Sequence, residues 1–190
     1  MQISWLIPPG GKKQNTHCAV TVEFDGRVTH LPYVEEGVEY PLVIGLFIYA
    51  MNKLGGYYFF ASAGLLITFG AITSFFLYKI TKVRSDVRRM IWMWVLAPSF
   101  LAFTVYNWDI IAVMFSVISL YFFMRRKVGI SSAFLSLGFC AKFFPVIFLP
   151  VYIVKERRAW KRILLSFFLV FIIVNGYFIA VNFEGWMYTY

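Results

Sequence analysis

Two charged side chains stand alone within long apolar stretches of the sequence. Lys142 is the only charged residue in residues 128–154, and Asp109 is the only one in residues 90–124. An ionised group inside a membrane is costly, so such a residue usually faces a partner, a cavity or an interface. An ammonium is suited to binding a phosphate, and a carboxylate can accept a proton from a hydroxyl. Both residues are therefore candidates for a chemical site.

Both residues also have explanations that involve no chemistry. Lys142 can extend its flexible stem to a membrane surface and keep its charge in water. Asp109 follows Asn107, which is a good helix N-cap, and a carboxylate in the first helical turn interacts favourably with the helix dipole. Trp108, between them, fits the aromatic belt of a membrane interface. The sequence leaves both interpretations of each residue open.

The composition indicates a membrane protein. Of the 190 residues, 61% are apolar and 14% are charged, whereas about 25% are charged in an ordinary soluble domain. Residues 57–78 and 163–183 contain no charge, and a helix needs roughly 20 apolar residues to cross the hydrocarbon core of a bilayer. We therefore expect an all-α integral membrane protein.

The net charge of +9 is concentrated in three short segments. Basic residues cluster at 79–89, 125–127 and 155–162, and each cluster ends an apolar stretch. Cytoplasmic loops of membrane proteins carry such an excess of Lys and Arg. We expect a multi-pass protein of the plasma membrane with these loops in the cytoplasm and with residues 1–39 and 184–190 outside. Because topology accounts for the basic charge, a nucleic-acid partner is not expected.

The same topology predicts where the helices turn. Residues 90–124 begin and end at cytoplasmic clusters, so they should form a hairpin that turns at 104–109. Residues 128–154 should also break, between Gly138 and Pro145, because proline interrupts a helix. We expect a polar outer segment at 1–39 and a membrane domain at 40–190, which has an interfacial helix at 40–53 and short or broken helices. The expected helices cover about 57–79, 89–105, 107–124, 129–141, 143–154 and 162–183.

The outer segment holds further candidate carboxylates. Most of its acidic residues are expected to be solvated, but a carboxylate above a membrane cavity could serve as a general base. The acidic residues of this segment are Glu23, Asp25, Glu35, Glu36 and Glu39, and Asp25 and Glu39 are the candidates among them. The two cysteines, Cys18 and Cys140, do not have the spacing of a metal site, and we expect neither a metal nor another cofactor.

Three motifs occur in a recognisable order between about residues 33 and 150. They read "PYVEEGVEYPLVIGLFIYAMN", then "YNWDIIAV", then "GFCAKFFPVIFLP". Together they resemble the polyprenyl-phosphate-sugar-dependent glycosyltransferases of the GT-C superfamily, and most of all glycosyltransferase family 87, which is mannosyltransferase-like. Each motif is short, so the resemblance rests on their combination.

The resemblance implies a multi-span GT-C-like helical core and an inverting reaction at the outer membrane face. A sugar, expected to be mannose, would pass from a polyprenyl-phosphate donor to an acceptor. Lys142 would bind the donor phosphate, and Asp25 or Asp109 would be the catalytic carboxylate. Glu39 and Tyr40 of "EYP", with Asn107 and Trp108 of "YNWD", would bind substrate.

The chain departs from the family at its beginning. Family members start with a membrane helix that the catalytic aspartate follows closely, and no such helix precedes Asp25. We therefore expect a fragment whose first helix belongs to an upstream segment or a partner chain. Two other functions remain open, a small transporter and a non-catalytic membrane subunit. The sequence of a transporter would be expected to contain inverted repeats, and a subunit would depend on its partner for stability.

Overall fold

The computed structural model describes residue 33 and residues 40–82, 87–96 and 107–187. These residues form helices and no strand, which confirms the all-α prediction. The helices are α1 (Leu42–Asn52), η1 (Gly55–Tyr57), α2 (Tyr58–Lys82), α3 (Val87–Met90), η2 (Ile91–Val95), α5 (Asp109–Met124), α6 (Val128–Ala141), η3 (Phe144–Ile147), α7 (Phe148–Lys155), η4 (Arg157–Ala159), α8 (Trp160–Val181) and α9 (Phe183–Met187).

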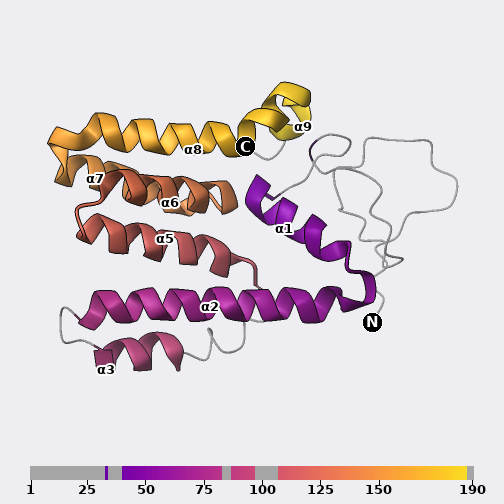
Figure 1. Cartoon of the computed structure of the whole chain (residues 1–190), viewed down its shortest axis with the longest axis horizontal. Helices are drawn as coiled ribbons and strands as arrows, with labels where there is room; N and C mark the ends of the chain where they lie inside the picture. The colour runs from indigo at the N-terminus through magenta and orange to yellow at the C-terminus, as the bar shows by residue number, and fades with distance from the viewer. Residues whose placement is uncertain (1–32, 34–39, 83–86, 97–106, 188–190) are drawn as a thin grey trace, which may run out of the picture.

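Figure 1 shows α2, α5, α6 and α8 side by side in a row, with α2 and α5 running in one direction, α6 and α8 in the other, and α1 inclined to them at one end. The C-terminal ends of α2, α5 and α7 all lie at the opposite end. We call this the basic end, because it carries Lys82, Arg88, Arg125, Arg126, Lys127, Lys155, Arg157 and Arg158. The end with α1 and α9 is called the site end. Described residues of all three basic clusters thus lie at one end of the bundle.

The predicted break in residues 128–154 is confirmed. Helix α6 ends at Ala141, and the chain resumes in the short helix η3 with Pro145 in its first turn. In a continuous helix the ring of Pro145 would meet the carbonyl of Ala141, four residues earlier, and Pro145 has no N–H to donate. Lys142 lies at the break in an extended conformation, with φ −155° and ψ 151°. The proline therefore determines where α6 ends.

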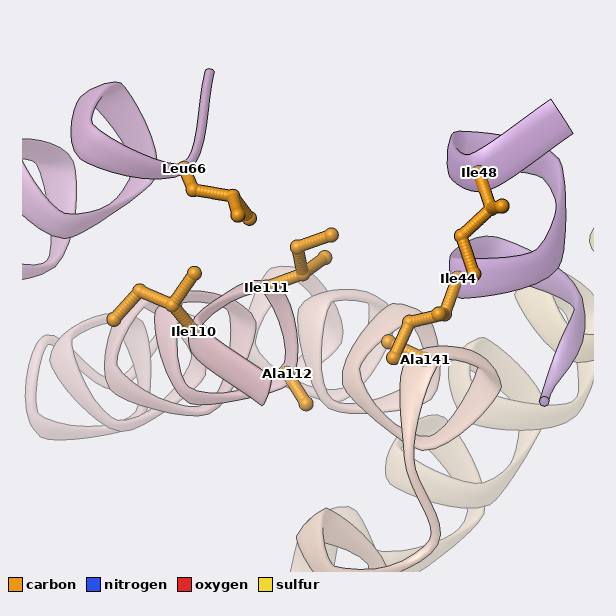
Figure 2. Packing of buried hydrophobic residues seen from close by; sticks show 7 residues of the cluster. All are labelled: Ile44, Ile48, Leu66, Ile110, Ile111, Ala112 and Ala141. Atoms are coloured by element: carbon orange, nitrogen blue, oxygen red, sulfur yellow. The ribbon is translucent and has the colours of Figure 1, made fainter. Parts of the chain in front are cut away.

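A cluster of buried apolar residues lies at the site end. It joins α1, α2, α5 and the last residue of α6, and its members are Ile44, Ile48, Leu66, Ile110, Ile111, Ala112 and Ala141. Figure 2 shows Leu66, Ile110 and Ile111 converging, with Ile44 beside Ala141. Close packing of this kind holds neighbouring backbones in one arrangement. The start of α5 and the end of α6 are consequently fixed relative to each other.

Polar side chains join α5, α6 and α7 nearer the basic end. The hydroxyls of Ser119 and Ser131 each donate to the main-chain oxygen of the other residue, at 2.8 and 2.9 Å. The hydroxyl of Tyr152, on α7, lies 3.1 Å from Ser119 Oγ. Hydrogen bonds between helices are a common means of joining helices where apolar burial gives little preference. They hold this part of the bundle in register.

Two helical stretches, Gly55–Lys82 and Arg157–Val181, are long and apolar enough to cross a membrane. Their large side chains mostly point away from the bundle: Phe60, Leu165 and Ile173 are 74%, 71% and 70% exposed. A soluble monomer rarely exposes so much contiguous apolar surface. The surface of α2 and α8 is thus suited to contact with lipid or other apolar partners.

The structure differs from the sequence predictions between α2 and α5. A helix was expected at 89–105, but helix α3 is followed by the π-helical turn η2, which ends at Val95. Residues 97–106 lie outside the described part of the chain, as do residues 1–39 apart from Tyr33. The expected interfacial helix corresponds to α1, which buries Leu42, Ile44 and Ile48 against the rest of the chain.

Candidate functional site

The two isolated charges of the sequence form an ion pair. Lys142 Nζ lies 2.9 Å from Asp109 Oδ1, a distance typical of a charge-assisted hydrogen bond. The side chains are 33% and 46% exposed, so a ligand can reach both. From the sequence these residues were expected to contact a membrane interface, a helix dipole or a substrate, and a contact between the two was not predicted.

The break after α6 brings Lys142 to Asp109. The N–H of Lys142 donates to Gly138 O at 2.9 Å, which is the last helical hydrogen bond of α6. The extended backbone of Lys142 then turns the chain away, and its side chain meets the first residue of α5. Because Ala141 and Ile110 belong to one packed cluster, the two elements that carry the pair are held by their nearest neighbours in sequence.

The start of α5 corrects the prediction for Asn107. The residue before the helix is Trp108, so Trp108 and not Asn107 stands at the N-cap position. The Asn107 side chain nevertheless performs a capping function, because the N–H of Asp109 donates to Asn107 Oδ1 at 3.0 Å. Asp109 lies in the first turn of α5, as expected. Its carboxylate thus interacts both with the helix dipole and with Lys142.

Two aromatic rings border the ion pair. Trp108 and Tyr40 pack edge to face with their centroids 5.4 Å apart. The Lys142 ammonium lies 5.8 Å from the centroid of the Tyr40 ring, within the range of a cation–π contact. Three separate segments of the chain therefore contribute to one group of neighbouring side chains. Its members are Tyr40, Asn107, Trp108, Asp109 and Lys142.

Two of the predicted site residues cannot be placed. Asp25 and Glu39 lie outside the described residues, so their predicted roles stay predictions. Within the described part of the chain, no group of three or more His, Cys, Asp or Glu side chains could hold a metal ion. The ion pair with its aromatic border is thus the candidate site that the structure describes.

Tyr33 also belongs to this region, and its burial was not predicted from the sequence. Its side chain is fully buried, and its hydroxyl donates to the main-chain oxygen of Tyr40 at 2.5 Å. A lone tyrosine in a polar segment carries no periodicity that would predict burial. The glycine of α1 that accommodates its ring, Gly45, could have suggested a close approach by another part of the chain.

The geometry is suited to binding an anion. An ammonium has three N–H donors, and the Asp109 carboxylate takes one of them. An ion pair within reach of solvent contributes only about 0–1 kcal/mol to stability, so an incoming phosphate can share the lysine without a large cost. The rings of Trp108 and Tyr40 offer apolar faces beside it. Comparison with family models, curated proteins and solved structures finds no match to this chain.

Proposed function

We propose that the chain is a multi-pass membrane glycosyltransferase, or the part of one that binds the donor, with a GT-C-like core. It would transfer a sugar, mannose in the simplest case, from a polyprenyl phosphate to an acceptor. The observation that carries the proposal is the Asp109–Lys142 ion pair at the broken end of α6, where the "YNWD" and "AKFFP" motifs meet. The likeness of these motifs to family 87 supplies the reaction.

The distribution of charge and apolar surface supports a membrane location. The basic end would face the cytoplasm, as the excess of Lys and Arg in its turns favours. The site end would then lie at the outer face, where lipid-linked sugars are donors in this superfamily. The exposed apolar side chains of α2 and α8 would face lipid.

Lys142 and Asp109 would have different roles in the reaction. The sugar's C1–O bond to the phosphate breaks, and the phosphate leaves with its negative charge, which the Lys142 ammonium would stabilise. The acceptor oxygen forms the new bond to C1 and gives its proton to a general base. Since Asp109 already holds the ammonium, we assign it to positioning Lys142, and we propose Asp25 as the base. Glu39 and Tyr40 would line the approach of the donor.

The proposal is tested with the chain in isolated membranes and a radiolabelled polyprenyl-phosphate mannose. Lys142→Met should weaken donor binding and lower transfer together, whereas Asp25→Asn should lower kcat by about 10²–10⁴-fold with little effect on donor binding. Lys53→Met is the matched control, because Lys53 is an exposed lysine on the turn after α1, with its ammonium over Tyr49 of the same helix.

The outcomes separate the candidate functions. Transfer that depends on Lys142 and not on Lys53 supports the glycosyltransferase. Donor binding that depends on Lys142, without transfer, would identify a subunit that holds the donor for a partner. Wild-type donor binding and transfer in Lys142→Met would remove the reason for assigning a phosphate to this site.

A further inference from the structure

We propose that Tyr33 is a positioning residue that holds the Tyr40 ring against the Lys142 ammonium of the Asp109–Lys142 pair. The inference rests on the proposed function only for what Lys142 does with a ligand. How Lys142 is held is a separate question, which can be answered without substrate.

The Tyr33 side chain occupies a position that the surrounding residues define closely. The residue has no exposed surface and a φ of 67°, in the left-handed region that a side chain disfavours. Such a backbone conformation persists when the surrounding structure fixes it. The Tyr33 ring packs edge to face on Phe178 of α8, with centroids 5.7 Å apart, and its main-chain oxygen lies against Gly185 of α9.

A glycine in α1 makes room for the ring. A Cβ atom at Gly45 would lie 1.8 Å from the Tyr33 hydroxyl oxygen and 2.7 Å from Cζ, so no larger residue fits without displacing the ring. In this position the hydroxyl donates to the main-chain oxygen of Tyr40, just before α1 begins. Tyr33 thus fixes the backbone from which the Tyr40 side chain extends.

Tyr40 connects this contact to the candidate site. Its ring packs on Trp108, which stands directly before Asp109, and it lies beneath the Lys142 ammonium. A change in the position of the Tyr40 backbone would therefore move the ring that covers Lys142. The contacts thus lead from α8 and α9, through Tyr33 and Tyr40, to Lys142 at the break after α6.

The test measures how fast Lys142 reacts in the purified chain in detergent micelles, without ligand. The protein is acetylated with an N-hydroxysuccinimide ester, and modification at Lys142 and Lys53 is followed by peptide mass spectrometry. Tyr33→Phe removes only the hydroxyl and should raise the rate at Lys142 by about three- to tenfold, the range that a single hydrogen bond can supply. Lys53 should react at its wild-type rate, because it contacts Tyr49 within α1.

Tyr152→Phe is the matched control. Tyr152 is also buried, and its hydroxyl also bonds to another helix, but it lies nearer the basic end. This variant should leave the rate at Lys142 unchanged. A rate at Lys142 that stays at the wild-type value in Tyr33→Phe, or one that rises equally in Tyr152→Phe, would overturn the proposal.

Gly45→Ala perturbs the contact between Tyr33 and α1 by changing α1 instead of Tyr33. The added methyl group should displace the Tyr33 ring and raise the rate at Lys142, with helix content checked by circular dichroism. Combined with Tyr33→Phe it should add little, because residues that act through one shared contact are not additive. Additive effects would overturn the shared contact. Loss of the positioning effect would leave the donor assay with Lys142→Met unaffected, so the two proposals fail separately.

Discussion

The two ends of the bundle each hold an ion pair, and the pairs differ in what surrounds them. At the basic end Arg126 bonds to Glu156, joining the turn after α5 to the turn after α7, with the Arg126 side chain 80% exposed. Further cations stand beside it, among them Arg125, Lys127 and Arg157. At the site end Asp109 and Lys142 pair beside Trp108 and Tyr40, on elements that a packed cluster fixes.

The two pairs differ in kind. Arg126 and Glu156 link two exposed turns, whereas Lys142 is a cation held in one position. A pair among surplus cations, open to solvent, contributes only about 0–1 kcal/mol and leaves the neighbouring charges free to meet any anion. A lysine held in one place by a carboxylate and an aromatic ring presents its remaining donors in a defined direction. The difference predicts that equivalent substitutions at the two ends have unequal consequences.

The largest contrast is expected between Lys142→Met and Arg126→Met. Under the proposed function, removing the Lys142 charge from the leaving phosphate should cost roughly 2–4 kcal/mol, or about 30- to 900-fold in kcat/KM. Arg126→Met should change kcat/KM by less than about twofold, because that pair lies at the far end of the bundle and is exposed. Steady-state transfer from a lipid-linked mannose measures both. Equal losses of kcat/KM in the two variants would contradict a special role for the pair at the site end.

Asp109→Asn sharpens the comparison at the site end alone. The variant keeps the N–H that bonds to Asn107 but loses the charge that holds Lys142. We expect a loss of about 0–1 kcal/mol in stability and about a three- to tenfold loss in transfer. In the Lys142→Met background the same change should have little further effect, since the two residues interact directly. Full additivity in this double-mutant cycle would contradict a positioning role.

Two glycines test how closely the elements around the pair are packed. A Cβ at Gly138 would lie 3.3 Å from both Phe115 Cβ and Pro145 Cγ, whereas nothing lies within 4 Å of one at Gly64. Gly64→Ala should therefore stabilise α2 by about 0.5–1 kcal/mol through helix propensity. In Gly138→Ala, crowding of the added methyl group should offset that stabilisation, so the free energy of unfolding should stay the same or fall by about 1 kcal/mol. Unfolding of both variants in mixed micelles provides the measurement.

An effect confined to the basic end is expected at Arg126, which has a φ of 60° where the chain leaves α5. The N–H groups of Arg126 and Lys127 donate to Phe123 O and Phe122 O, the pattern of a helix that ends in a left-handed residue. Glycine adopts this conformation freely. Arg126→Gly should thus be more stable than Arg126→Ala by about 1 kcal/mol, as read from thermal unfolding. The reverse order would mean that the left-handed backbone conformation at residue 126 costs alanine no more than glycine.

Much of the helical layout could be predicted from the sequence because its causes are local. Pro145 prevents α6 from continuing through its own position, so the break required only that residue. The basic clusters between apolar stretches indicated which turns share one end of the bundle. The π-helical turn of η2 was not predicted, since nothing in its apolar sequence distinguishes it from an α-helix.

The sequence by itself determined the all-helical class, the isolated charges Asp109 and Lys142, and the break that exposes one of them. Each of these follows from residue types and from spacing along one segment. Only the tertiary structure decided that the two charges meet, that the Tyr40 ring lies beside Lys142, and that Tyr33 fills the space over Gly45. Those contacts join segments that are far apart in the chain. They depend on how side chains pack between helices, and no periodic pattern within a single segment predicts that packing.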